Sequence, residues 1–236
     1  AESRGQGGIK HVLIVSEDGM RPDLITQQRL PWHERLAKEG SYSWHARTIR
    51  TASTLPAHAS MLSGVDVKLH GLTWNNWRPT KGFIQHPTIF NAAEAHGLKT
   101  AAFVGKFKLR HILPEGTVQT FVRPGYYCKK VSEEAAHYLA THRPDLTFVH
   151  FSDPDEAGHS AGWLSGAQLQ AARVAQARGL AVARAQQLVQ QHTEGRVLGL
   201  LGEPRVNVLR PPQRPRTARS SCVCARSSSA SAAWSP

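Results

Sequence analysis

Short apolar runs alternate along the chain with longer segments of mixed polarity. Residues 11–16 (HVLIVS) and 146–151 (LTFVHF) are near-continuous runs rich in β-branched and aromatic side chains, which is the pattern of parallel strands buried on both faces. Residues 99–105 (KTAAFVG) predict a third strand, and residues 41–50 can supply another.

Helical patterns and turn residues fill the intervals between these runs. A helix over residues 22–39 is interrupted by Pro31 and ended by Gly40, and residues 65–77 form a loop that turns at Gly71. Further helices are expected at residues 54–63, 88–96, 131–142 and 167–191. Because strand and helix alternate, the sequence predicts an α/β fold built on βαβ units.

The chain divides into three parts by composition. Residues 1–9 are Gly-rich and polar and predict a flexible lead-in. Residues 10–166 hold the strand and helix pattern, and 236 residues with 40% hydrophobic content are enough for a buried core. Residues 167–236 are rich in Arg, Ala and Ser and predict a helix followed by a disordered tail.

The net charge of +12 is concentrated in this tail. Residues 164–236 contain 10 of the 29 Lys and Arg residues but only two of the 17 Asp and Glu residues. The first part has no basic helix and no interleaving of basic and aromatic residues, so nucleic-acid binding is disfavoured. No apolar run reaches the roughly 18 residues of a membrane-spanning helix. The chain starts with Ala, from which we expect a processed, extracytoplasmic (periplasmic or secreted) protein.

Residues 51–64 (TASTLPAHASMLSG) predict a hydroxyl group at the start of a short helix. Thr54 stands at the expected N-cap, Pro56 follows in the first turn, and Gly64 ends the segment. A hydroxyl there faces unpaired N–H groups and the positive end of the helix dipole, which favours an anion such as phosphate. The alternative is an ordinary capping threonine.

Two predicted strands end in acidic residues. Asp18 and Gly19 follow the first strand, at the place where open α/β sheets bind ligands. Asp155 and His159 follow the strand at 146–151 and are four residues apart, so on a helical turn they could bind one metal ion. Alternatively, Asp18 forms a turn, while Asp153 and Asp155 cap a helix and His159 lies in solvent. Together with Thr54, these residues predict a metal-assisted phosphoryl-transfer site.

Three ordered motifs, SEDGMRPD, TLPAHASMLSG with HGLTWNN, and DPDEAGHSAG, resemble the type I phosphodiesterase and nucleotide pyrophosphatase family of the alkaline phosphatase superfamily. The resemblance covers about residues 10–163. It implies a mostly parallel sheet flanked by helices, with two divalent metal ions, expected to be zinc. Asp18 would bind one zinc, and Thr54 would be the nucleophile and contact the same ion. Asn75 would hold the phosphoryl oxygens, and Asp155 and His159 would bind the other zinc.

The implied activity is hydrolysis of phosphodiester or pyrophosphate bonds in a small phosphate ester or nucleotide, through a phosphothreonine intermediate. Zinc coordination would activate the weakly nucleophilic hydroxyl of Thr54. Sulfate esters are disfavoured, because residues 54–58 (TLPAH) lack the Cys or Ser of the sulfatase signature.

The second half of the family pattern is missing. The family continues with an Asp-His-Gly triplet and a later His, whereas this chain has no Asp after Asp155 and only His192 after His159. Each zinc site therefore keeps two protein ligands, fewer than zinc usually takes. We expect a truncated sheet and impaired activity. The alternatives are an inactive fragment that binds phosphate weakly, and a binder of anions or nucleic acid through the basic tail.

The tail also loses strand-forming residues abruptly. Residues 164–236 contain no Lys, Asp, Ile, Met, Phe or Tyr. We interpret the chain after about residues 163–166 as a frameshifted or mis-joined translation. The alternative is a genuine basic tail that binds an anionic partner.

Overall fold

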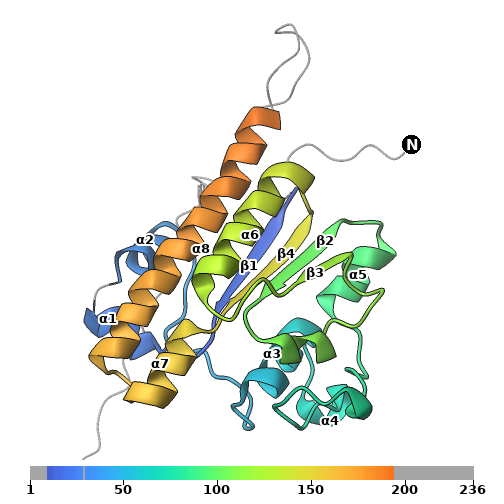
Figure 1. The fold of residues 1–236 in the computed structure, drawn as a ribbon, viewed down its shortest axis with the longest axis horizontal. Coiled ribbons are helices and arrows are strands. Elements are labelled where there is room, and N and C mark those ends of the chain that lie inside the picture. The colour runs from blue at the N-terminus through green and yellow to red at the C-terminus, as the bar shows by residue number, and fades with distance from the viewer. Residues whose placement is uncertain (1–9, 29, 194–236) are drawn as a thin grey trace, which may run out of the picture.

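Four parallel strands form the sheet at the centre of the structure, a computed structural model that describes residues 10–28 and 30–193. The strands are β1 (Val12–Glu17), β2 (Thr100–Val104), β3 (Thr120–Val122) and β4 (Leu146–Phe151). Their order in the sheet is β1-β4-β2-β3, so the last strand in the chain lies between the first two (Figure 1). All pairs are parallel, so the carboxyl ends of the strands meet at one edge.

Burial differs between the two strands that were expected to be buried on both faces. β4 lies inside the sheet and every one of its residues is buried, as predicted. Among the described residues, β1 pairs with β4 alone, and Val12 and Val15 remain 44% and 36% exposed. The expectation of burial on both faces is therefore wrong for β1, whose side chains are only partly covered at this edge of the sheet.

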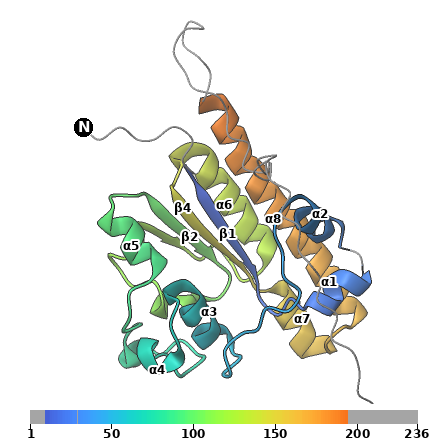
Figure 2. The ribbon, with the colours of Figure 1, turned by 180° about the vertical axis from the view of Figure 1, so that it is seen from behind.

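Helices cover both faces of the sheet (Figures 1 and 2). On one face, α3 (Thr54–Ser63) and α5 (Ile89–Ala95) pack against alternate strand residues such as Ala102 and Phe148. On the other face, α6 (Cys128–His142) and α8 (Gly166–Thr193) pack against the intervening residues, including Phe103 and Val149. The alternation follows from the pleat, which sends successive side chains to opposite faces.

Shorter helices complete the fold. α1 (Pro22–Gln28) and α2 (Pro31–Glu39) follow β1, and Leu24, Ile25 and Leu30 pack against Ala172 of α8. The predicted interruption at Pro31 is confirmed. The remaining short elements are α4 (Val67–His70), α7 (Asp153–Ala161) and 3-10 helices at Pro79–Lys81 and Phe107–His111.

The predicted α/β class, with a parallel sheet flanked by helices, is confirmed, but three local predictions need correction. Residues 41–50 form no strand, the predicted loop at residues 65–77 contains α4, and β3 was not predicted. The helix expected at residues 167–191 is α8, whereas the lead-in at 1–9 and the tail after residue 193 lie outside the described residues.

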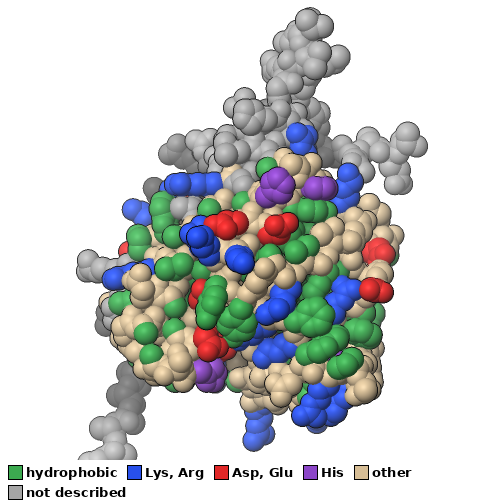
Figure 3. Space-filling view, in the orientation of Figure 1, with side chains coloured by type: hydrophobic (Ala, Val, Ile, Leu, Met, Phe, Trp, Pro, Cys, Tyr) green, Lys and Arg blue, Asp and Glu red, His purple; other side chains and the backbone are tan. Residues whose placement is uncertain are grey.

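Two surface properties bear on possible partners. None of the helices in the described ranges combines the length and the apolar character needed to cross a membrane. On the face shown in Figure 3, the described Lys and Arg side chains lie among apolar and acidic ones and do not form a continuous basic stripe.

Candidate active site

The candidate site lies at the carboxyl ends of β1, β4 and β2, where parallel α/β sheets bind ligands. Asp18 directly follows β1, and its N–H donates to the carbonyl of Phe151 at the end of β4 (2.9 Å). Lys106 follows β2, and Asp155 lies in the first turn of α7, two residues after that helix begins. The sheet therefore brings together groups that are up to 137 positions apart in sequence.

Thr54 is the first residue of α3, and the N-cap is Ser53. The prediction that Thr54 is the cap is wrong by one position, because Ser53 has the extended backbone of a cap (φ −116°, ψ 153°). The hydroxyl of Thr54 donates to Oδ2 of Asp18 at 3.0 Å, and the residue is 8% exposed. Gly64 ends the helix in the left-handed conformation (φ 74°), as predicted.

Lys106 links the two carboxylates of the site. Its Nζ lies 2.6 Å from Oδ2 of Asp18 and also forms an ion pair with Oδ2 of Asp155. Burial alone would lower the pKa of Lys106, but the charges of Asp18 and Asp155 raise it above its ordinary value. Lys106 therefore carries a full positive charge between the two acids.

Asp18 stays ionised despite its burial. Burial alone would raise the pKa of Asp18, but His150 and Lys106 hold it well below its ordinary value. An ionised Asp18 accepts the hydrogen bonds of both Thr54 and Lys106.

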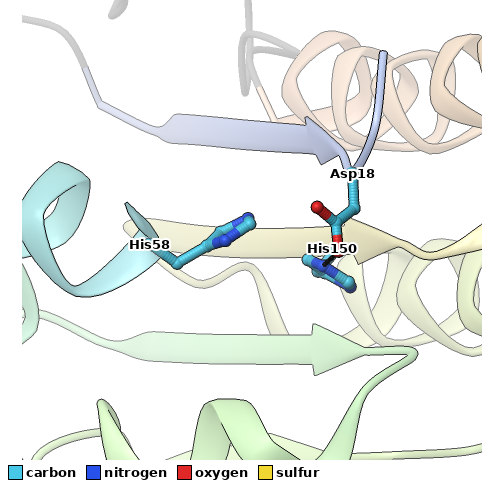
Figure 4. Close-up of side chains that lie close together, drawn as sticks. All are labelled: Asp18, His58 and His150. Carbon is cyan, nitrogen blue, oxygen red and sulfur yellow. Dashed lines mark ion pairs between the residues drawn. The ribbon is translucent and has the colours of Figure 1, made fainter. Parts of the chain in front are cut away.

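Two buried histidines complete a cluster with Asp18 (Figure 4). One ligand atom each from Asp18, His58 and His150 lies within 4.8 Å of the other two. His150 Nε2 is 3.4 Å from Oδ2 of Asp18, and neither ring nitrogen of His150 has a hydrogen-bond partner. A buried imidazole whose Nε2 contacts Asp18 without a hydrogen bond is suited to a metal ion.

His58 is held differently from His150. Burial, together with the neighbouring His150, lowers the pKa of His58 to about 4, so its ring is neutral near pH 7. Its Nδ1 lies 2.7 Å from the carbonyl of Thr54, which can only accept, so Nδ1 carries the proton. Nε2 then accepts from the hydroxyl of Ser16 at 2.8 Å. His58 thus fixes the first turn of α3, and metal binding would require it to release Ser16.

Asn75 joins the loop after α4 to the start of α3. Its Oδ1 accepts from the N–H of Leu55 (2.9 Å) and from Nζ of Lys108 (3.0 Å). Because two donors occupy the oxygen, the amide NH₂ group is what Asn75 can offer to a ligand. Burial and the nearby Lys106 lower the pKa of Lys108.

Asp155 and His159 lie on the same side of α7, as their spacing predicts. Nε2 of His159 is 3.5 Å from Oδ1 of Asp155, but the His159 side chain is 69% exposed and its ring packs edge-on against Trp163. Asp155 is thus shared between His159 and Lys106.

All five predicted site residues line one cavity of about 940 Å³. Asp18, Thr54, Asn75, Asp155 and His159 surround it, although their individual roles stay predictions. Lys106, Lys108, Arg123 and Tyr126 also line the cavity and were not identified from the sequence. The side chain of His192 lies outside the described residues.

The residues fit a divalent cation at Asp18. The carboxylate, the hydroxyl of Thr54 and the buried imidazole of His150 are oxygen and nitrogen donors that could bind zinc. His150 is a third candidate ligand that sequence reasoning missed. Its position just before the end of an apolar strand was the available signal, but a histidine in such a strand is more often an ordinary core residue.

Comparison with solved structures gives the same fold. Murine ectonucleotide pyrophosphatase/phosphodiesterase 5, an inactive variant in complex with AMP, has a TM-score of 0.64 and 15% identity, over 77% of this chain and 53% of that one. The phosphonoacetate hydrolase of Sinorhizobium meliloti 1021, in complex with phosphonoacetate, has a TM-score of 0.55 and 19% identity, over 75% and 54%. This chain therefore spans about half the length of these relatives.

A short stretch resembles a protein with a different name. The potassium-transporting ATPase KdpC subunit of Herpetosiphon aurantiacus is 70% identical over 43 residues, which are 18% of this chain and 22% of that protein. The likeness covers about a fifth of each chain.

The longest sequence match identifies the family. The pattern of the family described as type I phosphodiesterase / nucleotide pyrophosphatase matches residues 12–192, most of the chain. That range includes all five predicted site residues and every strand of the sheet. The chain belongs to the type I phosphodiesterase / nucleotide pyrophosphatase family of phosphoric ester hydrolases.

Proposed function

We propose that this chain hydrolyses phosphodiester or pyrophosphate bonds through a phosphothreonine intermediate on Thr54, with impaired efficiency. The observation that carries the proposal is the hydrogen bond from the hydroxyl of Thr54 to the ionised Asp18, at the wall of a cavity that also contains Lys106 and Lys108. A hydroxyl with its proton directed at a carboxylate turns its oxygen lone pairs toward other groups. That arrangement suits attack on phosphorus.

The start of α3 supplies a donor for the phosphoryl group. The N–H of Leu55 donates to Oδ1 of Asn75, and the N–H of Ala57 donates to the carbonyl of Ser53. Pro56 has no N–H. Within the described part of the chain, Thr54 N–H is thus the first-turn donor without a protein acceptor. With the helix dipole, it favours an anion next to the Thr54 hydroxyl.

Positive side chains and one amide would bind the phosphoryl oxygens. Lys108 donates a hydrogen bond to Asn75, and both residues line the cavity together with Arg123. Their hydrogen-bond donors suit the negative charge that develops on the phosphoryl oxygens in the transition state. The substrate class is a small phosphate ester or nucleotide, supported by the relative that was solved with AMP.

Metal ions have two candidate sets of ligands. Asp18, Thr54 and His150 would hold one ion, and Asp155 and His159 the other. Zinc bound there would lower the pKa of the Thr54 hydroxyl and stabilise charge on the attacking and leaving oxygens. Because the later Asp-His pair of the family is absent, we propose low metal affinity as the reason for impaired turnover.

Hydrolysis of a chromogenic phosphodiester with added zinc tests the proposal. We expect turnover by the wild type and loss of about 100-fold or more in Thr54→Ala, as expected when a nucleophile is removed. Thr26→Ala is the control, because Thr26 is exposed on α1 and its hydroxyl bonds to Pro22. Acid-quenched wild type should carry a phosphate on Thr54 by mass spectrometry. Equal rates for wild type and Thr54→Ala would refute the proposal.

The competing proposal is a phosphate-binding protein without turnover. The ion pairs of Lys106 favour it, because a lysine already occupies the carboxylates that would hold metal. It predicts phosphate binding that weakens in Asn75→Leu, with no hydrolysis at any zinc concentration.

A further inference from the structure

We infer that Lys106 is an internal cation that competes with divalent metal ions for Asp18 and Asp155. The inference rests on the proposed metal site but not on catalysis. It assigns Lys106 a role in controlling metal occupancy, beyond the ligand sets proposed above.

Lys106 engages one oxygen of each carboxylate. Its Nζ contacts Oδ2 of Asp18 and Oδ2 of Asp155, so one ammonium joins the ends of β1 and β4. The side chains are 7% exposed for Lys106, 11% for Asp18 and 17% for Asp155. Ion pairs with so little exposure are weakly screened by water, so the lysine is held firmly.

The same oxygens are the ones a metal ion would need. Zinc binds carboxylate oxygens at about 2.0–2.2 Å, which leaves no room for an ammonium on the same face of the same atom. On Asp18, Oδ2 already accepts from Thr54 and Lys106 and lies 3.4 Å from His150. A metal ion that joined Asp18 to Thr54 and His150 would therefore have to displace Lys106.

Charge balance gives the same result. The two carboxylates and the one ammonium that pairs with both leave a net charge of −1. Adding a divalent cation without moving Lys106 would place three positive charges against two negative ones in a mostly buried site. Displacement of Lys106 into the 940 Å³ cavity that it lines removes this excess.

Lys108 provides a matched control. It lies two residues after Lys106, lines the same cavity and pairs with the neutral Asn75, not with a carboxylate of the site. Lys106→Met and Lys108→Met remove the same charge from the same segment with a side chain of similar length. Only Lys106→Met removes the ion-pair partner of Asp18 and Asp155.

Zinc affinity, measured by competition with a chromophoric chelator, is the first test. We expect Lys106→Met to bind zinc at least about tenfold more tightly than wild type, since the competing charge is gone. Lys108→Met should bind zinc within about threefold of wild type. Without metal, Lys106→Met should melt at a lower temperature, because its carboxylates repel each other, and zinc should restore the melting temperature. Zinc affinity in Lys106→Met that equals or falls below that of wild type would overturn the inference.

Amine labelling of the wild type is the second test. It still tests whether zinc displaces Lys106 if the Lys106→Met variant does not fold. Acetylation read by mass spectrometry should show Lys106 protected in chelator and labelled faster in zinc, with the exposed Lys68 as an unchanged reference. Unchanged labelling of Lys106 while zinc binds would overturn the inference. Zinc affinity and Lys106 acetylation can both be measured without turnover. If zinc displaces Lys106 but the protein is inactive, the proposed function is refuted and the inference about Lys106 stands.

Discussion

Gly19 and Asp155 approach so closely that a Cβ on Gly19 would lie 2.5 Å from the Cα of Asp155. Gly19 has φ +74°, a conformation that side chains rarely adopt. The turn after β1 and the first turn of α7 are therefore in direct contact. This contact holds the backbones that carry Asp18 and Asp155 together.

Comparing Gly19→Ala with Gly64→Ala separates this contact from backbone strain. Both glycines have φ +74°, but a Cβ on Gly64 would meet nothing within 4 Å. Gly64→Ala should cost about 1 kcal/mol of unfolding free energy from strain alone. Gly19→Ala should cost at least about 2 kcal/mol more, because the backbone of Asp155 must move. Urea unfolding measures both, and equal losses would show that the contact carries no energy.

Asn75→Asp and Asn75→Leu should separate ligand binding from helix capping. Aspartate keeps an oxygen for the N–H of Leu55 and for Lys108 but loses the amide donor and adds a negative charge. We expect KM for a phosphodiester to rise about tenfold or more with little change in melting temperature. Asn75→Leu should also lose about 1 kcal/mol of stability. Identical stability for the two variants would contradict the capping role.

The ion pair between His33 and Glu17 should make stability depend on pH. Nε2 of His33 lies 3.2 Å from Oε2 of Glu17. Burial alone would lower the pKa of His33, but Glu17 raises it above its ordinary value of 6.5. The stabilisation is therefore fully present below about pH 6.5 and is lost as pH rises through the raised pKa of His33.

Urea unfolding of wild type and Glu17→Gln from pH 5.5 to 9 tests this effect. The difference in unfolding free energy should reach about 1 kcal/mol at the acidic end and shrink toward pH 9. His33→Gln is the control and should remove the pH dependence of the difference. A difference that grows with pH would give the opposite sign and refute the assignment.

Cys128 should resist alkylation in the folded protein. It is 1% exposed at the start of α6, and burial, together with the nearby carboxylate of Asp153, raises the pKa of its thiol to about 12. At pH 8 the reactive thiolate is therefore rare. Iodoacetamide should modify Cys128 at least about 100-fold more slowly than free cysteine, and at a comparable rate in urea. Fast modification under native conditions would show that α6 opens locally.

Reading the gene around codons 160–170 in all frames tests the interpretation of the tail. The family match extends to residue 192, beyond the boundary at about residues 163–166 that this interpretation assumes. A shifted frame that encodes a strand and Asp-His-Gly is the expected finding. Its absence from every frame would leave the genuine basic tail as the interpretation.

The central strands and the site carboxylates could be predicted because their signals are local. The bounds of β4 equal the predicted run, and Asp155 and His159 follow from helical spacing. The edge position of β1 could not be predicted, since strand order depends on pairing between distant segments. HVLIVS has the same apolar character whether one neighbour or two lies beside it.

The missed site residues depend on tertiary structure in the same way. Lys106 follows an apolar strand in a basic segment, and nothing in that segment places its ammonium between two carboxylates 88 and 49 positions away. His150 reads as part of a core strand. The one-position error at Thr54 has a different cause, because both Ser53 and Thr54 are good caps and only the backbone angles of Ser53 decide between them.

The strand order β1-β4-β2-β3 has a consequence for biosynthesis. β1 and β2 do not pair with each other. Each of them pairs with β4, which is the last of the four strands to be synthesised. Until about residue 160 has left the ribosome, Asp18 and Lys106 are attached to strands with no common partner. The insertion of β4 then completes the sheet and assembles the site in one event, which requires contacts across more than 130 residues and is therefore expected to be slow.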